Sequence, residues 1–441
     1  MKAEALSSIL EGFDGGQTVV LSAEARLTVD QLLENADALF RRSSVTSGSR
    51  IALCGLAVFD LITALAAFDG RAGAMLLLPA SADSASGDRL VLAAGCTHRM
   101  DGEGIRALPD CREGCGSADA DATQWLLATS GTTGVPKLIG HTLASLSRTV
   151  KRDVAKGRGF IWGLLYDPCR FAGLQVILQA LLSGSMLSVS SSHDFNRQVE
   201  GLVAGGVNAL SATPSLLRKL LMAGDIKECP LRQITLGGEI ADQQILDGLR
   251  HCFPSARIVH IYASTEAGVG FSVHDGMAGF PAAWLEDERK SVPMKVRGDG
   301  HLLVRPTTVP EGEEVAGRLD ADGYLDTGDL VCVAGDRVFF SGRASGSLNV
   351  GGNKVMPEYV EEHIRRVDGV FDVYVYGKKS SMMGQIVAAD IVLDPGVDKA
   401  VIRGNILSYC RSALENWQIP GVLRFVSGLE ETAAGKRERL I

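Results

Sequence analysis

The sequence predicts an α/β protein: a large N-terminal domain of parallel α/β sheets with a small β-barrel-like subdomain, then a small mobile α+β C-terminal domain. A strand–helix–strand pattern over residues 50–79 implies a right-handed crossover and a parallel sheet. Apolar strands followed by polar loops recur at 209–214, 233–239 and 257–262. From about residue 292, short alternating strands separated by Gly-Asp turns indicate an antiparallel subdomain.

The first 121 residues supply the expected start of the parallel sheet. Apolar residues at helical spacing predict a helix over 28–42. The strand–helix–strand unit follows, with its elements at 50–55, 57–68 and 74–79. Residues 83–121 are rich in Gly, Ala, Asp and Ser, and we expect loops there with one short strand at 90–92.

The middle of the chain continues the alternation of strands and helices. A short apolar run at 125–128 predicts a buried strand, and helices are expected at about 142–156 and over 171–182. Thr213 precedes Pro214 at the end of an apolar run, which is the pattern of an N-cap followed by proline in the first helical position.

The last third of the chain predicts two further units. The β-rich subdomain is expected over about 292–342, which places the large domain at 1–343 and the C-terminal domain at 344–441. The elements expected in the C-terminal domain are helices at about 357–366 and 400–414 and strands at about 370–376 and 386–392.

Composition excludes several classes of protein. The net charge of −8 argues against a general nucleic-acid binder. Nine scattered cysteines without a Cys-x-x-Cys pair predict free thiols in a reducing compartment rather than a zinc site. The longest apolar run, 51–68, is interrupted by Asp60, so no membrane span is expected. The N-terminus lacks a signal-peptide pattern, and we expect a cytoplasmic protein.

A glycine- and hydroxyl-rich string follows the apolar run at 125–128. Its glycines allow backbone N–H groups to converge on an anion, its hydroxyls add donors, and its lysine adds a mobile positive charge. It lacks the Gly-x4-Gly-Lys-[Ser/Thr] pattern, which argues against a P-loop NTPase. The string therefore predicts a polyphosphate site of another kind, built from Thr129, Ser130, Gly131, Thr132, Thr133, Gly134 and Lys137.

Other strings supply the remaining groups that a nucleotide and its metal require. Tyr262 lies at a strand end, and an aromatic ring there can stack on a base. Glu266 follows closely, and a carboxylate can hold Mg²⁺ against phosphate oxygens. Asp329 has two acceptor oxygens for the two hydroxyls of a ribose, and Arg343 adds donors. Each residue alone also fits a structural role, such as a cap or an exposed charge.

Taken in order from Thr129 to Arg439, these strings closely resemble the adenylate-forming superfamily of acyl- and aryl-CoA synthetases, peptide-synthetase adenylation domains and luciferases. The phosphate loop usually arrives later in that superfamily, so the chain looks like a shortened member. The resemblance implies that ATP, Mg²⁺ and either CoA or a phosphopantetheine arm take part. A carboxylic acid would be converted into an acyl-adenylate with release of pyrophosphate, and the acyl group would then pass to the thiol.

The resemblance also implies a role for each matching residue. The loop from Ser130 to Lys137 would hold the β- and γ-phosphates, Thr265 the α-phosphate and Glu266 the metal. Lys436 would bridge the acid and the α-phosphate, because a preorganised positive charge stabilises two anions that approach each other. The adenine would be framed by Gly237, Gly238, Glu239 and Tyr262, and the ribose would be held by Asp329 and Arg343. The loop at Gly351 and Gly352 would reach the site after the C-terminal domain rotates.

The chain departs from the superfamily pattern at two places. The hinge position, two residues after Arg343, is usually Asp or Lys and is Ser345 here. The last motif commonly opens with a basic residue, and here that residue is Glu431. A serine can still turn the chain, so the resemblance continues to imply a hinge at this position.

The acid is expected to occupy a pocket lined by Arg170, Phe171, Gly173, Ala263 and Ser264. Arg170 stands where the superfamily usually has histidine, and it could bind an anionic or hydroxylated group or pair with a surface acid. Ala263 replaces a usual glycine, and one added methyl group shortens the pocket. These features favour a small aromatic acid of hydroxybenzoate type. The alternatives are a fatty acyl-CoA or acyl-carrier-protein ligase, and a non-catalytic nucleotide-binding protein of the same fold.

Overall fold

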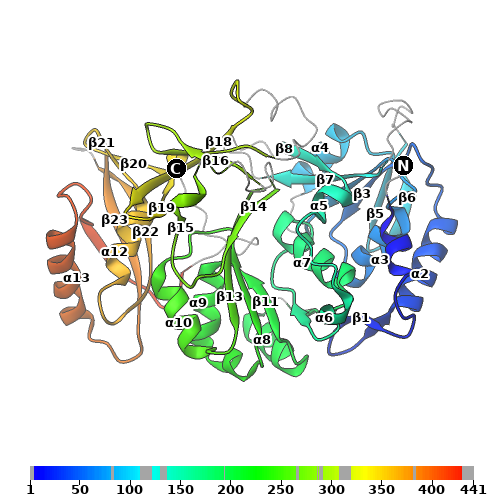
Figure 1. Ribbon diagram of the computed structural model, residues 1–441, viewed down its shortest axis with the longest axis horizontal. Coiled ribbons are helices and arrows are strands. Elements are labelled where there is room, and N and C mark those ends of the chain that lie inside the picture. The colour runs from blue at the N-terminus through cyan, green and yellow to red at the C-terminus, as the bar shows by residue number, and fades with distance from the viewer. Residues whose placement is uncertain are drawn as a thin grey trace.

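The computed structural model describes residues 4–80, 84–109, 122–129, 137–192, 194–264, 268–285, 287, 292–306, 319–380 and 384–429. The elements follow the chain across Figure 1, from the N-terminal sheet at the right to helix α13 at the far left. No helix among these residues is long and apolar enough to cross a membrane. The α/β architecture of a large N-terminal domain and a small C-terminal domain confirms the predicted fold class.

The first sheet has six strands in the order β6-β5-β3-β4-β7-β8. Strands β5, β3, β4 and β7 are parallel, and β6 and β8 close the two edges in antiparallel fashion. Helix α3 (Val58–Phe68) connects β3 to β4, which confirms the strand–helix–strand prediction. The strands are β3 (Arg50–Cys54), β4 (Ala74–Leu78), β5 (His98–Asp101), β6 (Gly104–Ala107), β7 (Gln124–Thr129) and β8 (Lys137–His141).

The second sheet has eight strands in the order β14-β13-β12-β11-β9-β10-β1-β2. All neighbouring pairs from β13 to β1 are parallel, whereas β14 and β2 are antiparallel edge strands. The strands are β1 (Thr18–Leu21), β2 (Arg26–Thr28), β9 (Ile161–Gly163), β10 (Met186–Ser188), β11 (Ala209–Ala212), β12 (Gln233–Gly237), β13 (Arg257–Ser264) and β14 (Gly268–Val273).

The helices of the large domain enclose two main apolar cores. Side chains of α1 (Leu6–Leu10), α2 (Val29–Arg42), α3 and α7 (Phe171–Leu182) meet in the first core. Side chains of α8 (Phe195–Ala204), α9 (Pro214–Ala223), the 3₁₀ helix η1 (Asp225–Glu228) and α10 (Gln243–Cys252) meet in the second. Thr213 caps α9 by accepting the Leu216 N–H, with Pro214 in the first turn, as predicted.

The third sheet is antiparallel, in the order β15-β19-β18-β17-β16. It begins at Phe280, earlier than the predicted start near residue 292, because β15 pairs with β19. Its elements are β15 (Phe280–Pro281), η2 (Ala282–Trp284), β16 (Met294–Val296), β17 (His301–Val304), β18 (Leu325–Ala334) and β19 (Arg337–Arg343).

The fourth sheet belongs to the C-terminal domain and follows the 3₁₀ helix η3 (Ala344–Gly346). Strands run in the order β21-β20-β23-β22, with β24 paired to β23, and α12 and α13 pack on one face. The predicted helices and strands of this domain are all present. They are β20 (Leu348–Val350), β21 (Asn353–Val355), α12 (Pro357–Arg365), β22 (Val370–Ser380), β23 (Gly384–Leu393), α13 (Lys399–Ala413) and β24 (Val422–Phe425).

Two predicted elements were wrong. The region expected as loops with a strand at 90–92 instead forms helix α4 (Ser84–Ala93) followed by strands β5 and β6, so residues 90–92 are helical. Leu90, Val91 and Ala94 are buried in one apolar cluster while Leu92 is 82% exposed, which is helical rather than alternating burial.

The single helix expected over 142–156 is instead two short helices, α5 (Leu143–Leu146) and α6 (Val154–Gly157). The backbone between these two helices is bonded to a side chain of α7. Gln179 accepts a hydrogen bond from the Lys151 N–H and donates one to the Lys151 carbonyl. Asp153 then caps α6 by accepting the Lys156 N–H.

Candidate active site

The residues predicted to bind the phosphates, the metal and the adenine lie at or just after the carboxyl ends of three parallel strands. Strand β7 ends at Thr129, β12 ends at Gly237, and β13 ends at Ser264. Binding at the carboxyl ends of strands is typical of parallel α/β sheets. The predicted residues outside the described part of the chain are Ser130, Gly131, Thr132, Thr133, Gly134, Thr265, Glu266 and Lys436. Thr129, Lys137 and Ser264 are described as strand backbone only.

A segment before α7 connects the ends of two of these strands. At one end of the segment, the buried hydroxyl of Tyr166 donates to the carbonyl of Gly237, 3.3 Å away, at the end of β12. At the other end, Nη1 of Arg170 donates to the carbonyl of Ala128, 3.4 Å away, at the end of β7. Because β7 and β12 belong to different sheets, this segment links the end of a strand in the first sheet to the end of a strand in the second.

Arg170 places a positive charge at the end of β7. It is half-buried at the N-cap of α7, and none of the described side chains forms an ion pair with it within 4 Å. Its Nε is buried and has no acceptor among the described residues. A buried donor without an acceptor is costly, so a ligand that supplies one would bind favourably here. Contact between this residue and the acid stays a prediction.

The next two predicted pocket residues are constrained by packing. The ring of Phe171 lies 5.7 Å from the ring of His141. A Cβ added to Gly173 would lie 2.1 Å from the carbonyl oxygen of Asp167, far inside contact distance. Gly173 therefore lets α7 pack directly on the 166–170 segment, and this packing explains the glycine without reference to a substrate.

Three residues predicted to bind the nucleoside form one hydrogen-bonded group, the Tyr262–Asp329–Arg343 triad. The hydroxyl of Tyr262 donates to Oδ2 of Asp329 at 2.6 Å, and Nε of Arg343 donates to Oδ1 at 2.9 Å. Asp329 and Arg343 are direct partners in the antiparallel pair β18–β19, which explains how they meet. Asp329 is buried, whereas the side chain of Arg343 is 57% exposed and can reach a ligand.

The surroundings of Tyr262 fix its ring. It stacks with Phe271 and with Phe340, each at a centroid distance of 5.2 Å. Burial raises the pKa of the Tyr262 hydroxyl well above its usual value, and the adjacent Asp329 carboxylate raises it further. The hydroxyl therefore stays protonated and donates. The neighbouring Ala263 is half-buried in β13 and is paired with Val269 of β14.

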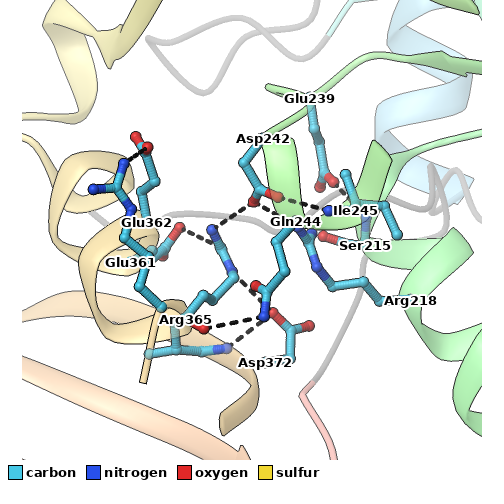
Figure 2. Close-up of polar contacts among 12 residues, drawn as sticks. Ser215, Arg218, Glu239, Asp242, Gln244, Ile245, Glu361, Glu362, Arg365 and Asp372 are labelled. Carbon is cyan, nitrogen blue, oxygen red and sulfur yellow. Dashed lines mark hydrogen bonds and ion pairs between the residues drawn. The ribbon is translucent and has the colours of Figure 1, made fainter. Parts of the chain in front are cut away.

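The loop after β12 also has a defined geometry. Gly238 adopts φ = 81°, a conformation that favours glycine. Oε2 of Glu239 accepts the backbone N–H of Ser215 at 3.0 Å, so this carboxylate lies at the first turn of α9 (Figure 2). A negative charge is stabilised at a helix N-terminus. Burial raises the pKa of Tyr166, and the charge of nearby Glu239 adds to this effect.

The predicted thiolation loop and hinge are exposed. Gly351 and Gly352 form the turn between β20 and β21, with φ of 57° and 90°. Both glycines are solvent-exposed, and Asn349 Oδ1 accepts the Gly352 N–H. Ser345 is exposed within η3, the connection between the third and fourth sheets.

Sequence reasoning did not assign a role to Tyr166. The available signal was an aromatic residue immediately before Asp-Pro and four residues before Arg170. Its burial and its bond to Gly237 depend on how the two sheets pack, which the local sequence does not contain.

Comparison with protein families identifies the fold and its two parts. Residues 72–319 match the AMP-binding enzyme family, and residues 359–436 match the AMP-binding enzyme C-terminal domain. A 2-succinylbenzoate–CoA ligase from Listeria innocua is 24% identical over 350 residues, covering 74% of this chain and 70% of that protein.

Solved structures share the same fold over almost the whole chain. ATP-bound MatB from Rhodopseudomonas palustris superposes with a TM-score of 0.75 at 20% identity, covering 99% of this chain and 97% of that chain. An o-succinylbenzoate CoA synthetase, MenE from Bacillus subtilis, in complex with the acyl-adenylate intermediate OSB-AMP, superposes with a TM-score of 0.73 at 19% identity. The coverage is 98% of this chain and 96% of that chain.

Proposed function

The chain belongs to the AMP-binding enzyme family, and from this premise we propose that it activates a small aromatic carboxylic acid with ATP and transfers the acyl group to a thiol. Acid–thiol ligation is its reaction class. In the first step a carboxylate oxygen attacks the α-phosphorus, and the bond to pyrophosphate breaks. In the second step a thiolate sulfur attacks the acyl carbon, and AMP leaves with the electrons of the C–O bond.

The observation that best supports this proposal is the Tyr262–Asp329–Arg343 triad. These residues come from two different sheets and meet at the strand that leads into Thr265 and Glu266. A buried carboxylate held by two donors is preorganised to accept further hydrogen bonds from ribose hydroxyls. The exposed guanidinium beside it can donate to the sugar or phosphate.

The phosphate and metal contacts fall to residues outside the described part of the chain. We propose that the Ser130–Lys137 loop holds the pyrophosphate that leaves, that Thr265 contacts the α-phosphate and that Glu266 holds Mg²⁺. Lys436 would lie between the acid and the α-phosphate. Its domain would extend from residue 344 and turn at Ser345, bringing Gly351 and Gly352 to the site for thiol transfer.

The proposed acid is a small aromatic one. The relatives that act on succinylbenzoate support an aromatic substrate, and Arg170 supports one that carries a second acceptor group, such as a hydroxyl or carboxylate. Its guanidinium lies at the end of β7, and its buried Nε has no acceptor among the described residues. We propose CoA as the thiol, and a carrier-protein phosphopantetheine as the alternative acceptor.

Acid-dependent ATP–pyrophosphate exchange over a panel of benzoates and fatty acids tests the proposal. Hydroxybenzoates should give the fastest exchange, and a clear preference for chains of C12 or longer would refute the aromatic assignment. Lys436→Ala should slow exchange by about 10²–10³. The exposed Lys399, at the start of α13, provides a matched control as Lys399→Ala, which should exchange at the wild-type rate. ATP binding without any exchange would support a non-catalytic protein.

A further inference from the structure

A buried network of charges joins the large domain to the C-terminal domain (Figure 2). Asp242 lies at the N-cap of α10 and accepts the Ile245 N–H through Oδ1. Its other oxygen, Oδ2, accepts from Arg218 Nη2 of α9 at 2.5 Å and from Arg365 Nη1 of α12 at 3.0 Å. The side chains of all three charged residues are at most 10% exposed.

Two hydrogen bonds of this network cross between the domains. One is the bond from Arg365 to Asp242, and the other runs from Nε2 of Gln244 to the backbone carbonyl of Arg365 at 3.1 Å. We call these two bonds the domain latch. Burial alone would raise the pKa of Asp242, but the charges of Arg218 and Arg365 outweigh it and hold the pKa below its ordinary value.

Each side of the latch has partners of its own. Arg365 also contacts Glu361 at 3.2 Å and Asp372 at 3.4 Å, both within the C-terminal domain. Across the interface, Asp242 keeps Arg218 and the cap of α10. Separating a buried ion pair usually costs several kcal/mol because a charge is left without a partner. Here separation leaves both charges paired, so the latch can open and close again.

The exposed thiolation loop indicates which orientation the latch holds. Thiol transfer in the proposed function requires Gly351 and Gly352 to enter the site, where neighbouring chain would cover them. Both residues are instead solvent-exposed while the latch is closed. The latched orientation is therefore not the one that transfers the acyl group.

We propose that Asp242, Gln244 and Arg365 act as positioning residues that hold the C-terminal domain away from its thiol-transfer orientation, so that latch strength sets the balance between the two half-reactions. This inference rests on the proposed function. Loss of a hydrogen bond to a charged group should shift the orientation equilibrium about 10- to 100-fold, and loss of a neutral one about 2- to 10-fold.

The test compares the two half-reactions in the full-length enzyme. Acid-dependent ATP–pyrophosphate exchange reports adenylation, and single-turnover transfer from preformed acyl-adenylate to CoA reports the second step. Asp242→Asn should raise the ratio of transfer to exchange by about 10-fold or more, and Gln244→Leu by about 2- to 10-fold. Gln244→Leu removes no charge, so it keeps the test decisive if Asp242→Asn folds poorly. Arg366→Gln is the control, since Arg366 pairs with Glu362 inside the C-terminal domain at an exposed site.

A merely structural role would lower both half-reactions in proportion and leave the ratio unchanged, and that result would overturn the proposal. Hydrogen–deuterium exchange of residues 242–252 and 357–366 gives a readout that does not depend on catalysis. Uptake should rise in Asp242→Asn and Gln244→Leu but not in Arg366→Gln. If the wild type shows no ATP–pyrophosphate exchange with any acid, the proposed function fails. Deuterium uptake alone then decides whether the latch exists.

Discussion

Replacing Tyr262 with phenylalanine removes one hydroxyl from the proposed nucleotide site and keeps the stacked ring. The hydroxyl is 2.6 Å from Oδ2 of Asp329, and this carboxylate is buried. Hydrogen bonds to charged groups contribute about 1.5–3 kcal/mol. We expect the free energy of unfolding of Tyr262→Phe to fall by about 2 kcal/mol, because one oxygen of a buried carboxylate loses its donor.

The same change should weaken ATP binding. Without the hydroxyl, Arg343 is the remaining side-chain partner of Asp329 among the described residues, and the carboxylate can turn away from the ribose that it is proposed to hold. A loss of about 1.4 kcal/mol in binding corresponds to a tenfold change in affinity. The KM for ATP should therefore rise about tenfold, with a smaller change in kcat, measured by pyrophosphate exchange at saturating acid.

The pH dependence of this effect follows from the raised pKa of Tyr262. The folded protein favours the neutral phenol, so its stabilising contribution is complete below the ordinary tyrosine pKa of about 10. The contribution is lost as pH rises from that value through the still higher folded pKa. The difference in stability between wild type and Tyr262→Phe should thus be constant between pH 6 and 9.

The chain offers a matched control in a second tyrosine–aspartate–arginine group. The Tyr376 hydroxyl lies 3.3 Å from Asp390, which also pairs with Arg424, and all three belong to the C-terminal sheet. Tyr376→Phe should leave the KM for ATP unchanged. If Tyr376→Phe and Tyr262→Phe raise the KM equally, or if Tyr262→Phe only lowers stability, the assignment of the triad to the nucleotide is wrong.

Further substitutions test the packing and the pocket. Gly173→Ala should lower the free energy of unfolding by at least about 2 kcal/mol, since its Cβ would overlap the Asp167 carbonyl. Gly248→Ala in α10, where a Cβ meets only ordinary contacts, should instead raise the free energy of unfolding by about 0.5–1 kcal/mol. Both variants are measured by urea unfolding, and a change of the same sign in the two would contradict the packing argument. Arg170→Gln should raise the KM for hydroxybenzoates about tenfold and the KM for benzoate less, as measured by ATP–pyrophosphate exchange. Equal increases for the two acids would show that Arg170 does not recognise the hydroxyl group.

The parts of the fold that the sequence predicted well have strong local signals. Strands β3, β4, β12 and β13 are largely apolar runs bounded by glycine or polar residues, and each appears as expected. Residues 90–92 were mistaken for a strand because three consecutive apolar residues do not distinguish the helical period from the strand period. Their helical burial becomes visible only when Ala94 is included. The break between α5 and α6 depends on Gln179, about thirty residues away, and no local pattern contains it.

In the candidate site, too, features with a local sequence signal were predicted and contacts between distant residues were not. The strings that hold Tyr262, Asp329 and Arg343 are recognisable one by one, because each lies at a strand end with a characteristic neighbourhood. That the tyrosine donates to the aspartate is a contact between residues 67 positions apart. The sequence predicted only that Tyr262 helps to frame the adenine, and this stays a prediction. The latch contact between Asp242 and Arg365 spans 123 positions and had no sequence signal at all.

The loop after β12 connects the proposed nucleotide site to the latch. Gly237 accepts from Tyr166, Glu239 caps the first turn of α9, and only three residues further Asp242 holds Arg365. A nucleotide that orders this loop would also restrain Asp242, and by linkage the latch and the nucleotide would stabilise each other.

We therefore expect ATP to lower the deuterium uptake of residues 357–366 in the wild type. The decrease should be smaller in Gln244→Leu, because one of the two bonds that transmit the restraint is missing. Uptake that falls equally in both proteins would mean that ATP acts on the C-terminal domain by another route. Uptake that does not change would mean that nucleotide binding has no differential affinity for the latched orientation, and the loop would then serve the two functions independently.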